Sequence, residues 1–223
     1  MGDEFLRYFI DYGHLKPGGR VLDVGSGDGR MARALTSYLD PSGSYEGLEI
    51  VRSGVEWCQG AITTKYPRFR FQHADIFNQV YNADGKIPAS RYQFPFDAAE
   101  FDFVFLTSVF THMLAEDYRH YLDEISRVLK PGGWCFASMF LVTREAQAGI
   151  TSGRSNPRFR FRLGGLWVDD LKLPEKAVAY LEADVLSDFE DRGLSPEPIR
   201  YGYWCGRSDF VSCQDLVAAT KAA

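Results

Sequence analysis

The chain has 223 residues, of which 45% are hydrophobic and 25% are charged, and this balance predicts a single globular domain, residues 1–223, with a sizeable core. Its formal net charge of -5 gives no general attraction to nucleic acid or anionic membranes, so we expect neither as a partner. No apolar run approaches the roughly 20 residues of a membrane span, and Asp3 and Glu4 lie where a signal peptide would be basic. We therefore expect a cytoplasmic protein.

Short apolar runs alternate along the chain with amphipathic stretches at helical period. This alternation predicts an α/β fold in which helices cover a mostly parallel sheet. The predicted elements are, in chain order, strand 20–24, helix 30–39, strand 44–50, helix 51–65, strand 69–73, strand 101–106, helix 113–129, strand 134–141, helix 173–193, and strands 199–204 and 210–217.

Two long connections do not fit this alternation. Residues 78–99 and 143–172 are rich in aromatic residues and arginine, a composition that argues against a disordered linker. Because long connections in a compact domain are often functional, we expect both insertions to form a substrate pocket or a lid.

Arginine and phenylalanine alternate in the second insertion, where Arg158 and Arg160 flank Phe159. The pattern predicts a strand with one basic and one aromatic face. The basic face could bind a substrate carboxylate or phosphate, which arginine holds bidentately. The alternative is an exposed edge hairpin, since strands commonly alternate in this way.

Three glycines follow the first predicted strand in the stretch VLDVGSGDG, at Gly25, Gly27 and Gly29. Glycine permits a tight turn and a close approach of ligand to backbone, and ligands of open parallel sheets bind beyond the carboxyl ends of the strands. A dinucleotide-binding loop would have its third glycine one residue later and would receive a pyrophosphate. Here Asp28 would repel that anion, so the loop suits a positively charged ligand such as S-adenosylmethionine.

An acidic residue lies at or just after the end of the second and of the third predicted strand. Glu49 closes the second predicted strand, where a carboxylate can accept hydrogen bonds from both hydroxyls of a ribose. Asp75 follows the third strand and is placed to accept from an adenine amino group. The alternatives are a solvated acid at the end of a strand for Glu49 and a helix N-cap for Asp75.

Five blocks together resemble the class I, Rossmann-like methyltransferases of the small-molecule type 11 or 25 group: VLDVGSGDG, YEGLEI, HADIF, FDFVFLTSVFTHM and RVLKPGG. The resemblance implies a seven-stranded, mostly parallel sheet with helices on both faces and an antiparallel last strand. It also implies S-adenosylmethionine as the cofactor. The residues that would bind it, directly or beside the motif positions, are Asp23, Gly25, Ser26, Gly27, Asp28, Glu49, Ile50, Asp75, Ile76, Thr107 and Ser108.

The candidate catalytic residue is His112, which follows the fourth predicted strand at the edge where cofactor and acceptor should meet. An alcohol or phenol acceptor must lose a proton, and histidine has the unperturbed pKa that suits a general base. The alternative is a histidine that packs or caps near a helix start. Weaker candidates for binding the acceptor are Tyr8, Tyr12 and Tyr203, besides Arg158 and Arg160.

The expected function is methyl transfer to oxygen, less favourably nitrogen, of a small molecule. Alternatives are a nicotinamide-dependent oxidoreductase, whose phosphate fingerprint is absent, and a regulatory module that binds the cofactor without turnover. Leu106 to Val109 occupy the place of the Pro-Pro motif of many nucleic-acid methyltransferases. The widely spaced cysteines and scattered acids predict neither a disulfide framework nor a bound metal.

Overall fold

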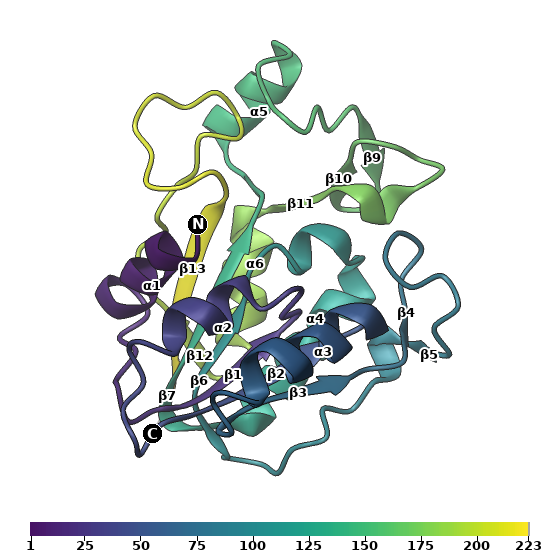
Figure 1. Ribbon diagram of the computed structural model, residues 1–223. Helices are drawn as coiled ribbons and strands as arrows, with labels where there is room; N and C mark the ends of the chain where they lie inside the picture. Colours follow the sequence, from purple (N-terminus) through teal and green to yellow (C-terminus); the bar gives the residue numbers. More distant parts are fainter. Residues whose placement is uncertain (223) are drawn as a thin grey trace.

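The structure, a computed structural model, describes residues 1–222 and contains a central seven-stranded sheet in the order β12-β13-β7-β6-β1-β2-β3 (Figure 1). β13 is antiparallel to both its neighbours, and the other neighbouring pairs are parallel. This confirms the α/β fold with an antiparallel last strand. The strands are β1 Arg20–Val24, β2 Ser44–Glu49, β3 Phe69–His73, β6 Phe101–Leu106, β7 Leu129–Met139, β12 Leu194–Pro196 and β13 Asp215–Lys221.

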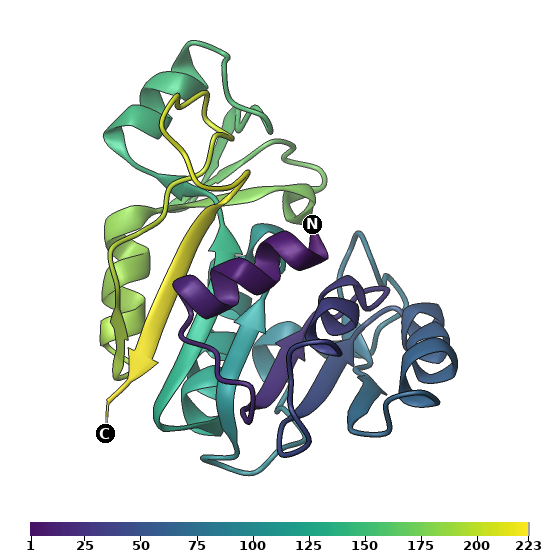
Figure 2. The same ribbon diagram turned by 60° about the vertical axis from the view of Figure 1, so that its left-hand side comes forward.

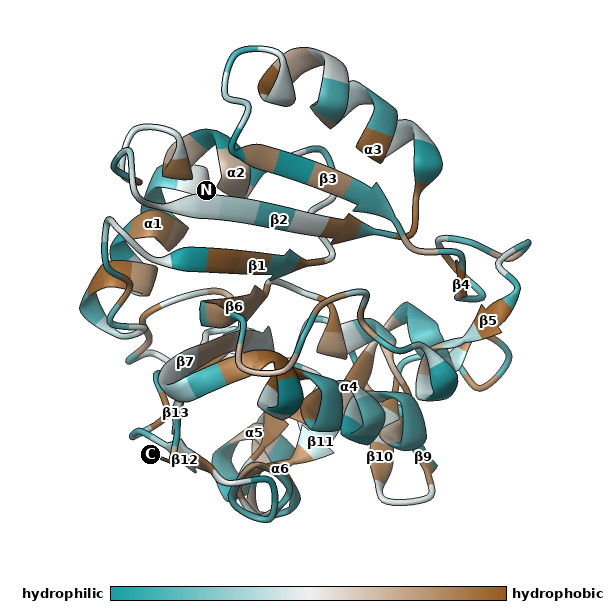
Figure 3. Cartoon of the chain, turned by 90° about the horizontal axis from the view of Figure 1, so that it is seen from below, coloured by the Kyte–Doolittle hydropathy of each residue, from teal (hydrophilic) through white to brown (hydrophobic). Residues whose placement is uncertain are grey.

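Helices cover both faces of this sheet, with α1, α2 and α3 on one face and α4 and α6 on the other (Figure 3). The α-helices are α1 Gly2–Asp11, α2 Arg30–Leu35, α3 Arg52–Cys58, α4 Ala115–Val128, α5 Arg144–Thr151 and α6 Glu182–Glu190. The short helical turns are η1 Gln59–Thr63, which is a π-helix, and the 3-10 turns η2 Ala89–Arg91, η3 Phe110–His112 and η4 Pro174–Lys176.

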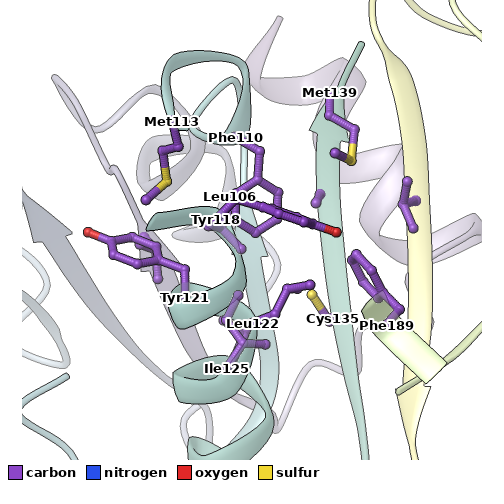
Figure 4. Close-up of a cluster of buried hydrophobic side chains, with 14 of the residues drawn as sticks. Leu106, Phe110, Met113, Tyr118, Tyr121, Leu122, Ile125, Cys135, Met139 and Phe189 are labelled. Carbon is purple, nitrogen blue, oxygen red and sulfur yellow. The ribbon is translucent and has the colours of Figure 1, made fainter. Parts of the chain in front are cut away.

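The apolar stripe of α4 shows why these helices dock. Tyr118, Tyr121, Leu122 and Ile125 recur at helical spacing and are all buried, and Figure 4 shows them in one cluster with side chains of the neighbouring strands and of α6. A stripe of this spacing gives the helix one apolar face. Its burial against the sheet supplies the main stabilisation of this layer.

A second, four-stranded sheet follows β7 along the chain and has the order β8-β11-β10-β9. Its strands are β8 Leu141–Val142, β9 Phe161–Leu163, β10 Leu166–Val168 and β11 Val178–Leu181. With α5 it lies above the end of the central sheet in Figure 1. A third, two-stranded sheet joins β4 Ile76–Phe77 to β5 Ile87–Pro88 within the first insertion. Of the helices in residues 1–222, none has the length and apolarity of a membrane span.

The prediction of one helix over 173–193 is wrong in its first half. That half contains η4 and then the strand β11, and only Glu182–Glu190 forms α6. Val178, Ala179 and Tyr180 are buried in the second sheet, where β11 pairs with both β8 and β10. Tertiary pairing therefore overrides the helical spacing of these apolar residues.

The predicted strand 199–204 is also wrong, and the strand predicted over 210–217 begins only at Asp215. The chain enters β12 directly after Gly193, and the last strand is Asp215–Lys221. Residues 197–214 are irregular; one isolated bridge joins Arg200 to Leu216 of β13, and another joins Gly202 to Ser212 within the segment. The carboxylate of Asp215 holds this segment, because it accepts hydrogen bonds from the Gly202 backbone and the Trp204 indole.

Two boundaries differ from the predictions for local reasons. The helix predicted to reach residue 39 ends at Leu35, where the hydroxyls of Thr36 and Ser37 compete for carbonyls of the last turn. β7 begins at Leu129 rather than Trp134, because Leu129 already pairs with Phe101 and the residues up to Trp134 bulge out of the ladder.

The predicted alternation around Phe159 fails. Phe159 is fully buried with a φ of 45°, whereas Phe161 on the strand β9 is 39% exposed. The positive φ turns the chain at Phe159, so the two phenylalanines do not share a face and no continuous strand carries Arg158 and Arg160.

Candidate active site

The glycine loop requires glycine for two separate reasons. Gly25, Gly27 and Gly29 all have positive φ, from 55° to 86°, a conformation that side chains disfavour. A Cβ at Gly25 would collide with Val109, and one at Gly29 would lie 2.6 Å from Ile62. A Cβ at Gly27 would meet nothing within 4 Å. The outer two glycines therefore allow close packing, and the middle one lies at an open surface.

That surface is one wall of a cavity of about 420 Å³ at the carboxyl ends of β1, β2, β3 and β6. The predicted site residues that line it are Gly25, Gly27, Asp28, Glu49, Ile50, Ile76, Thr107, Ser108 and His112. A larger groove of about 610 Å³ beside Arg20, Glu46 and Arg70 contains none of the predicted site residues. The first cavity is therefore the candidate site, as expected for a ligand of an open parallel sheet.

Glu49 joins the glycine loop to the end of β2. Its carboxylate accepts hydrogen bonds from the backbone N–H of Gly27 at 2.6 Å and of Val51 at 2.7 Å, and the residue is only 6% exposed. Charge-assisted hydrogen bonds of this kind are strong. The carboxylate is thus held at the cavity wall by two backbone donors.

His112 lies across the cavity at the end of η3. Its Nδ1 is 2.9 Å from the carbonyl oxygen of Glu175, which only accepts, so Nδ1 carries the proton and donates. The other ring nitrogen, Nε2, therefore carries no proton, can accept a hydrogen bond, and lies 3.2 Å from the hydroxyl of Tyr81. Burial lowers the pKa of His112 below its ordinary value of 6.5, against the raising effect of the backbone hydrogen bonds. The cavity consequently contains a neutral imidazole at neutral pH.

Two distant segments hold His112 in place. The Asn78 side chain donates to the carbonyl oxygen of His112 at 3.1 Å, and the Gln79 backbone N–H donates to the carboxylate of Glu175 at 2.6 Å. The first insertion is thereby tied both to the histidine and to the residue that orients its ring. Such hydrogen bonds fix the direction of the imidazole ring.

Residues 22–137 match a family model described as a methyltransferase domain, which is more than half of the chain. The chain belongs to this family. The chain is a methyltransferase domain with the class I fold, which confirms the family, the type of enzyme and the cofactor, S-adenosylmethionine, expected from the sequence.

The methyltransferase is also similar to curated proteins. It is 32% identical over 117 residues to a phthiotriol/phenolphthiotriol dimycocerosates methyltransferase of Mycobacterium tuberculosis, a match that covers 52% of this chain and 36% of the relative. It is 27% identical over 148 residues to a demethylmenaquinone methyltransferase of Lysinibacillus sphaericus, covering 66% and 53%. The matches thus span about a third to a half of the lengths of these relatives.

A solved structure extends the similarity of fold to the whole chain. The 1,6-didemethyltoxoflavin-N1-methyltransferase of Burkholderia thailandensis, solved with 1,6-didemethyltoxoflavin and S-adenosylhomocysteine, superposes with a TM-score of 0.61 at 17% identity. The superposition covers 100% of this chain and 77% of the other. At this identity the likeness shows the fold alone.

The residues beneath the glycine loop fit a cationic cofactor. Asp23 Oδ1 and Ser26 Oγ are buried and have no hydrogen-bond partner among residues 1–222. Burial raises the pKa of Asp23 to about 8, although the hydrogen bond from the Tyr45 hydroxyl opposes the shift. A nearby ligand cation would favour the ionised carboxylate. S-adenosylmethionine has both an ammonium and a sulfonium, and its ribose suits the acceptor oxygens of Glu49.

Not all predicted cofactor residues reach the cavity. Asp23 and Ser26 are not among its lining residues. Asp75 also lies outside the lining, and its carboxylate is 3.9 Å from the ammonium of Lys86. Its neighbours Ala74 and Ile76 do line the cavity. The adenine role of Asp75 therefore stays a prediction.

The five weaker acceptor candidates lie away from the cavity. Tyr8 stacks on Tyr12, with ring centroids 5.9 Å apart, and its hydroxyl donates to the carbonyl of Val211. Tyr203 is 48% exposed and packs edge-on against Phe210. Arg158 and Arg160 are exposed. The structure thus brings none of these five residues to His112.

Several lining residues were not assigned from the sequence. Asn78, Tyr81 and Tyr92 come from the first insertion, whose aromatic composition was the available signal. Tyr121 comes from the buried face of α4. The second insertion, 143–172, contributes no lining residue among those described. No group of three or more His, Cys, Asp or Glu in residues 1–222 is arranged to hold a metal ion.

We expect Tyr180→Phe to destabilise the methyltransferase by about 1–2 kcal/mol, because the Tyr180 hydroxyl donates to the carbonyls of Phe110 at 3.1 Å and Met113 at 2.6 Å. Loss of the hydroxyl would leave the Met113 carbonyl without its donor, whereas the Phe110 carbonyl would keep the hydrogen bond from the Met113 backbone N–H at 3.3 Å. Urea denaturation measures the free energy of unfolding. The matched control is Tyr118→Phe, since the buried Tyr118 hydroxyl has no hydrogen-bond partner in the described part of the chain; an equal loss of stability in both variants would contradict the role of Tyr180.

Proposed function

We propose that this methyltransferase transfers a methyl group to an oxygen atom of a small hydroxylated acceptor, with His112 as the general base. The observation that supports this proposal most directly is the orientation of the imidazole. Nδ1 donates to the Glu175 carbonyl, and Nε2 lies in the same cavity as Glu49 and the glycine loop. A base in that position serves an acceptor that must lose a proton.

S-adenosylmethionine supplies a methyl group bonded to a positively charged sulfur. Nε2 of His112 would take the proton of the acceptor hydroxyl while the acceptor oxygen bonds to the methyl group that the cofactor would supply, and the sulfur would keep the electron pair of the broken bond. The imidazole would thereby become positively charged as the sulfur becomes neutral. The Glu175 carbonyl accepts from Nδ1 throughout and so stabilises the charged ring.

The cavity walls favour an acceptor with an apolar or aromatic body. Beyond the glycine loop the lining includes Ile76, Phe77, Tyr92, Met113 and Tyr121, and a cavity of about 420 Å³ is within the range of small-molecule sites. The relatives are named for phthiotriol dimycocerosates and demethylmenaquinone, which is compatible with such an acceptor. We further propose that the first insertion forms the acceptor side of the site and that the protein acts in the cytoplasm, without nucleic acid as substrate.

Nitrogen is the second candidate for the accepting atom, because the structurally similar Burkholderia enzyme is named an N1-methyltransferase. A neutral amine can attack without a base, whereas an alcohol or phenol needs one at neutral pH. The neutral Nε2 of His112 therefore favours oxygen.

The test is a panel of matched acceptors that differ only in the reacting group, such as phenols against anilines and fatty alcohols against fatty amines. Release of S-adenosylhomocysteine is measured with each acceptor. We expect turnover with a hydroxyl compound and little with its amine counterpart. Turnover with amines alone would overturn the oxygen assignment, and tight binding of S-adenosylhomocysteine without any turnover would favour a non-catalytic binding module.

A further inference from the structure

The hydroxyl of Tyr81 is hydrogen-bonded to Nε2 of His112, the nitrogen that acts as base in the proposed function. Its hydroxyl is 3.2 Å from Nε2 of His112, and the two rings meet edge to face with centroids 5.0 Å apart and an interplanar angle of 80°. Because Nδ1 carries the ring proton, Nε2 accepts and the Tyr81 hydroxyl donates. Tyr81 and His112 both line the cavity. A hydroxyl group of the protein itself is thus hydrogen-bonded to the base.

The backbone that carries Tyr81 is anchored independently of this contact. The Asn78 carboxamide oxygen accepts from the backbone N–H groups of Val80 and Tyr81, each at 3.0 Å. Asn78 and Asn82 exchange two backbone hydrogen bonds, at 3.1 and 3.0 Å. The turn is therefore closed by its own bonds.

The Tyr81 side chain, in contrast, is loosely held. The residue is 50% exposed, and among residues 1–222 its hydroxyl makes one hydrogen bond, to His112. Rotation of an exposed side chain about its χ angles takes place on the picosecond to nanosecond scale. The ring can move away from His112 without breaking the turn.

We propose that the Tyr81 hydroxyl is an internal stand-in for the acceptor: it occupies Nε2 of His112 in the free protein and is exchanged for the acceptor's hydroxyl on binding. This inference rests on the proposed function and names a positioning residue within the same site. Tyr81 keeps the Nε2 lone pair paired until a second hydroxyl replaces it. Tyr81 also makes the site selective for hydroxyl compounds, since a ligand without a hydroxyl cannot replace the hydrogen bond between Tyr81 and His112 that it displaces.

The test compares the wild-type protein, Tyr81→Phe and the control Tyr66→Phe by NMR with ¹⁵N-labelled histidine, with and without S-adenosylhomocysteine. Tyr66 is 43% exposed, comparable to Tyr81, and does not line the cavity. His112→Asn identifies the resonances of His112. Phenol, titrated into each protein, is the hydroxylic probe, and its affinity is read from the shift of Nε2.

In Tyr81→Phe we expect the Nε2 resonance to move toward that of an imidazole nitrogen without a donor, and phenol to bind about 2- to 12-fold more tightly than to the wild type, because no internal hydrogen bond must be broken. In Tyr66→Phe we expect neither effect. Equal or weaker phenol binding in Tyr81→Phe would mean that Tyr81 holds the acceptor rather than standing in its place. An Nε2 signal unchanged by Tyr81→Phe, or unchanged by phenol in all three proteins, would also overturn the proposal.

These readouts need no turnover. Failure to methylate any hydroxyl compound would therefore reject the proposed function while leaving the Tyr81 result interpretable. Conversely, turnover with a hydroxyl compound together with an unchanged Nε2 signal of His112 would reject the proposal for Tyr81 and leave the proposed function in place.

Discussion

His112→Asn is expected to lower kcat for a hydroxyl acceptor by about 10²- to 10⁴-fold, the usual contribution of a positioned general base. Asparagine retains an N–H that can donate to the Glu175 carbonyl but offers no basic nitrogen. Binding of S-adenosylhomocysteine, measured by calorimetry, should be nearly unchanged. Steady-state kinetics with the acceptor found in the panel measures the loss.

The control for this substitution is His14→Asn, because His14 interacts with Glu197 and does not line the cavity. Wild-type kcat/KM should also fall as the pH is lowered through the pKa of His112, since the protonated ring cannot accept a proton. Burial places that pKa below 6.5, so the fall should occur below pH 6.5. Wild-type kinetics in His112→Asn would show that the residue only packs.

Glu49→Ala is expected to weaken binding of S-adenosylhomocysteine by about 1.5–3 kcal/mol, as for loss of a charged hydrogen-bond acceptor. The carboxylate also pairs with the backbone of Gly27 and Val51, so its removal loosens the loop as well as the ligand. Calorimetric titration of S-adenosylhomocysteine, with NAD titrated in parallel, measures both affinity and ligand preference.

Glu49→Gln separates charge from shape, because glutamine keeps one acceptor oxygen. We expect it to lose part of the affinity. Glu56→Ala, an exposed position on α3 that does not line the cavity, controls for the change in net charge. Wild-type affinity in Glu49→Ala, or binding of NAD in preference to S-adenosylhomocysteine, would contradict the role given to Glu49.

The cofactor side of the site could be predicted because its signals are local. The loop glycines and Glu49 lie within 25 residues of one another, and parallel pairing of β1 with β2 brings them together. The acceptor side could not be predicted in the same way. Tyr81 and Glu175 reach His112 through contacts 31 and 63 residues apart in sequence, and no periodicity encodes such a meeting.

The fold shows the same division. The strands β1, β2, β3 and β6 were predicted within one residue, because each is a short segment of strand-forming residues between turn or helix signals. The strands of the C-terminal third were not predicted with the same accuracy. Residues 178–181 form a strand only because β8 and β10 lie beside them, and residues 199–204 remain irregular because the buried Asp215 accepts their hydrogen bonds.

The wide spacing of the contacts around His112 also bears on how the enzyme acquires its activity during synthesis. Contacts between distant residues form late in folding, and the N-terminal part of a chain leaves the ribosome first. The glycine loop and Glu49 precede residue 50, whereas the carbonyl that orients His112 belongs to Glu175. A growing chain would therefore complete the glycine-loop wall of the cavity before its imidazole is fixed, and the base would be assembled last.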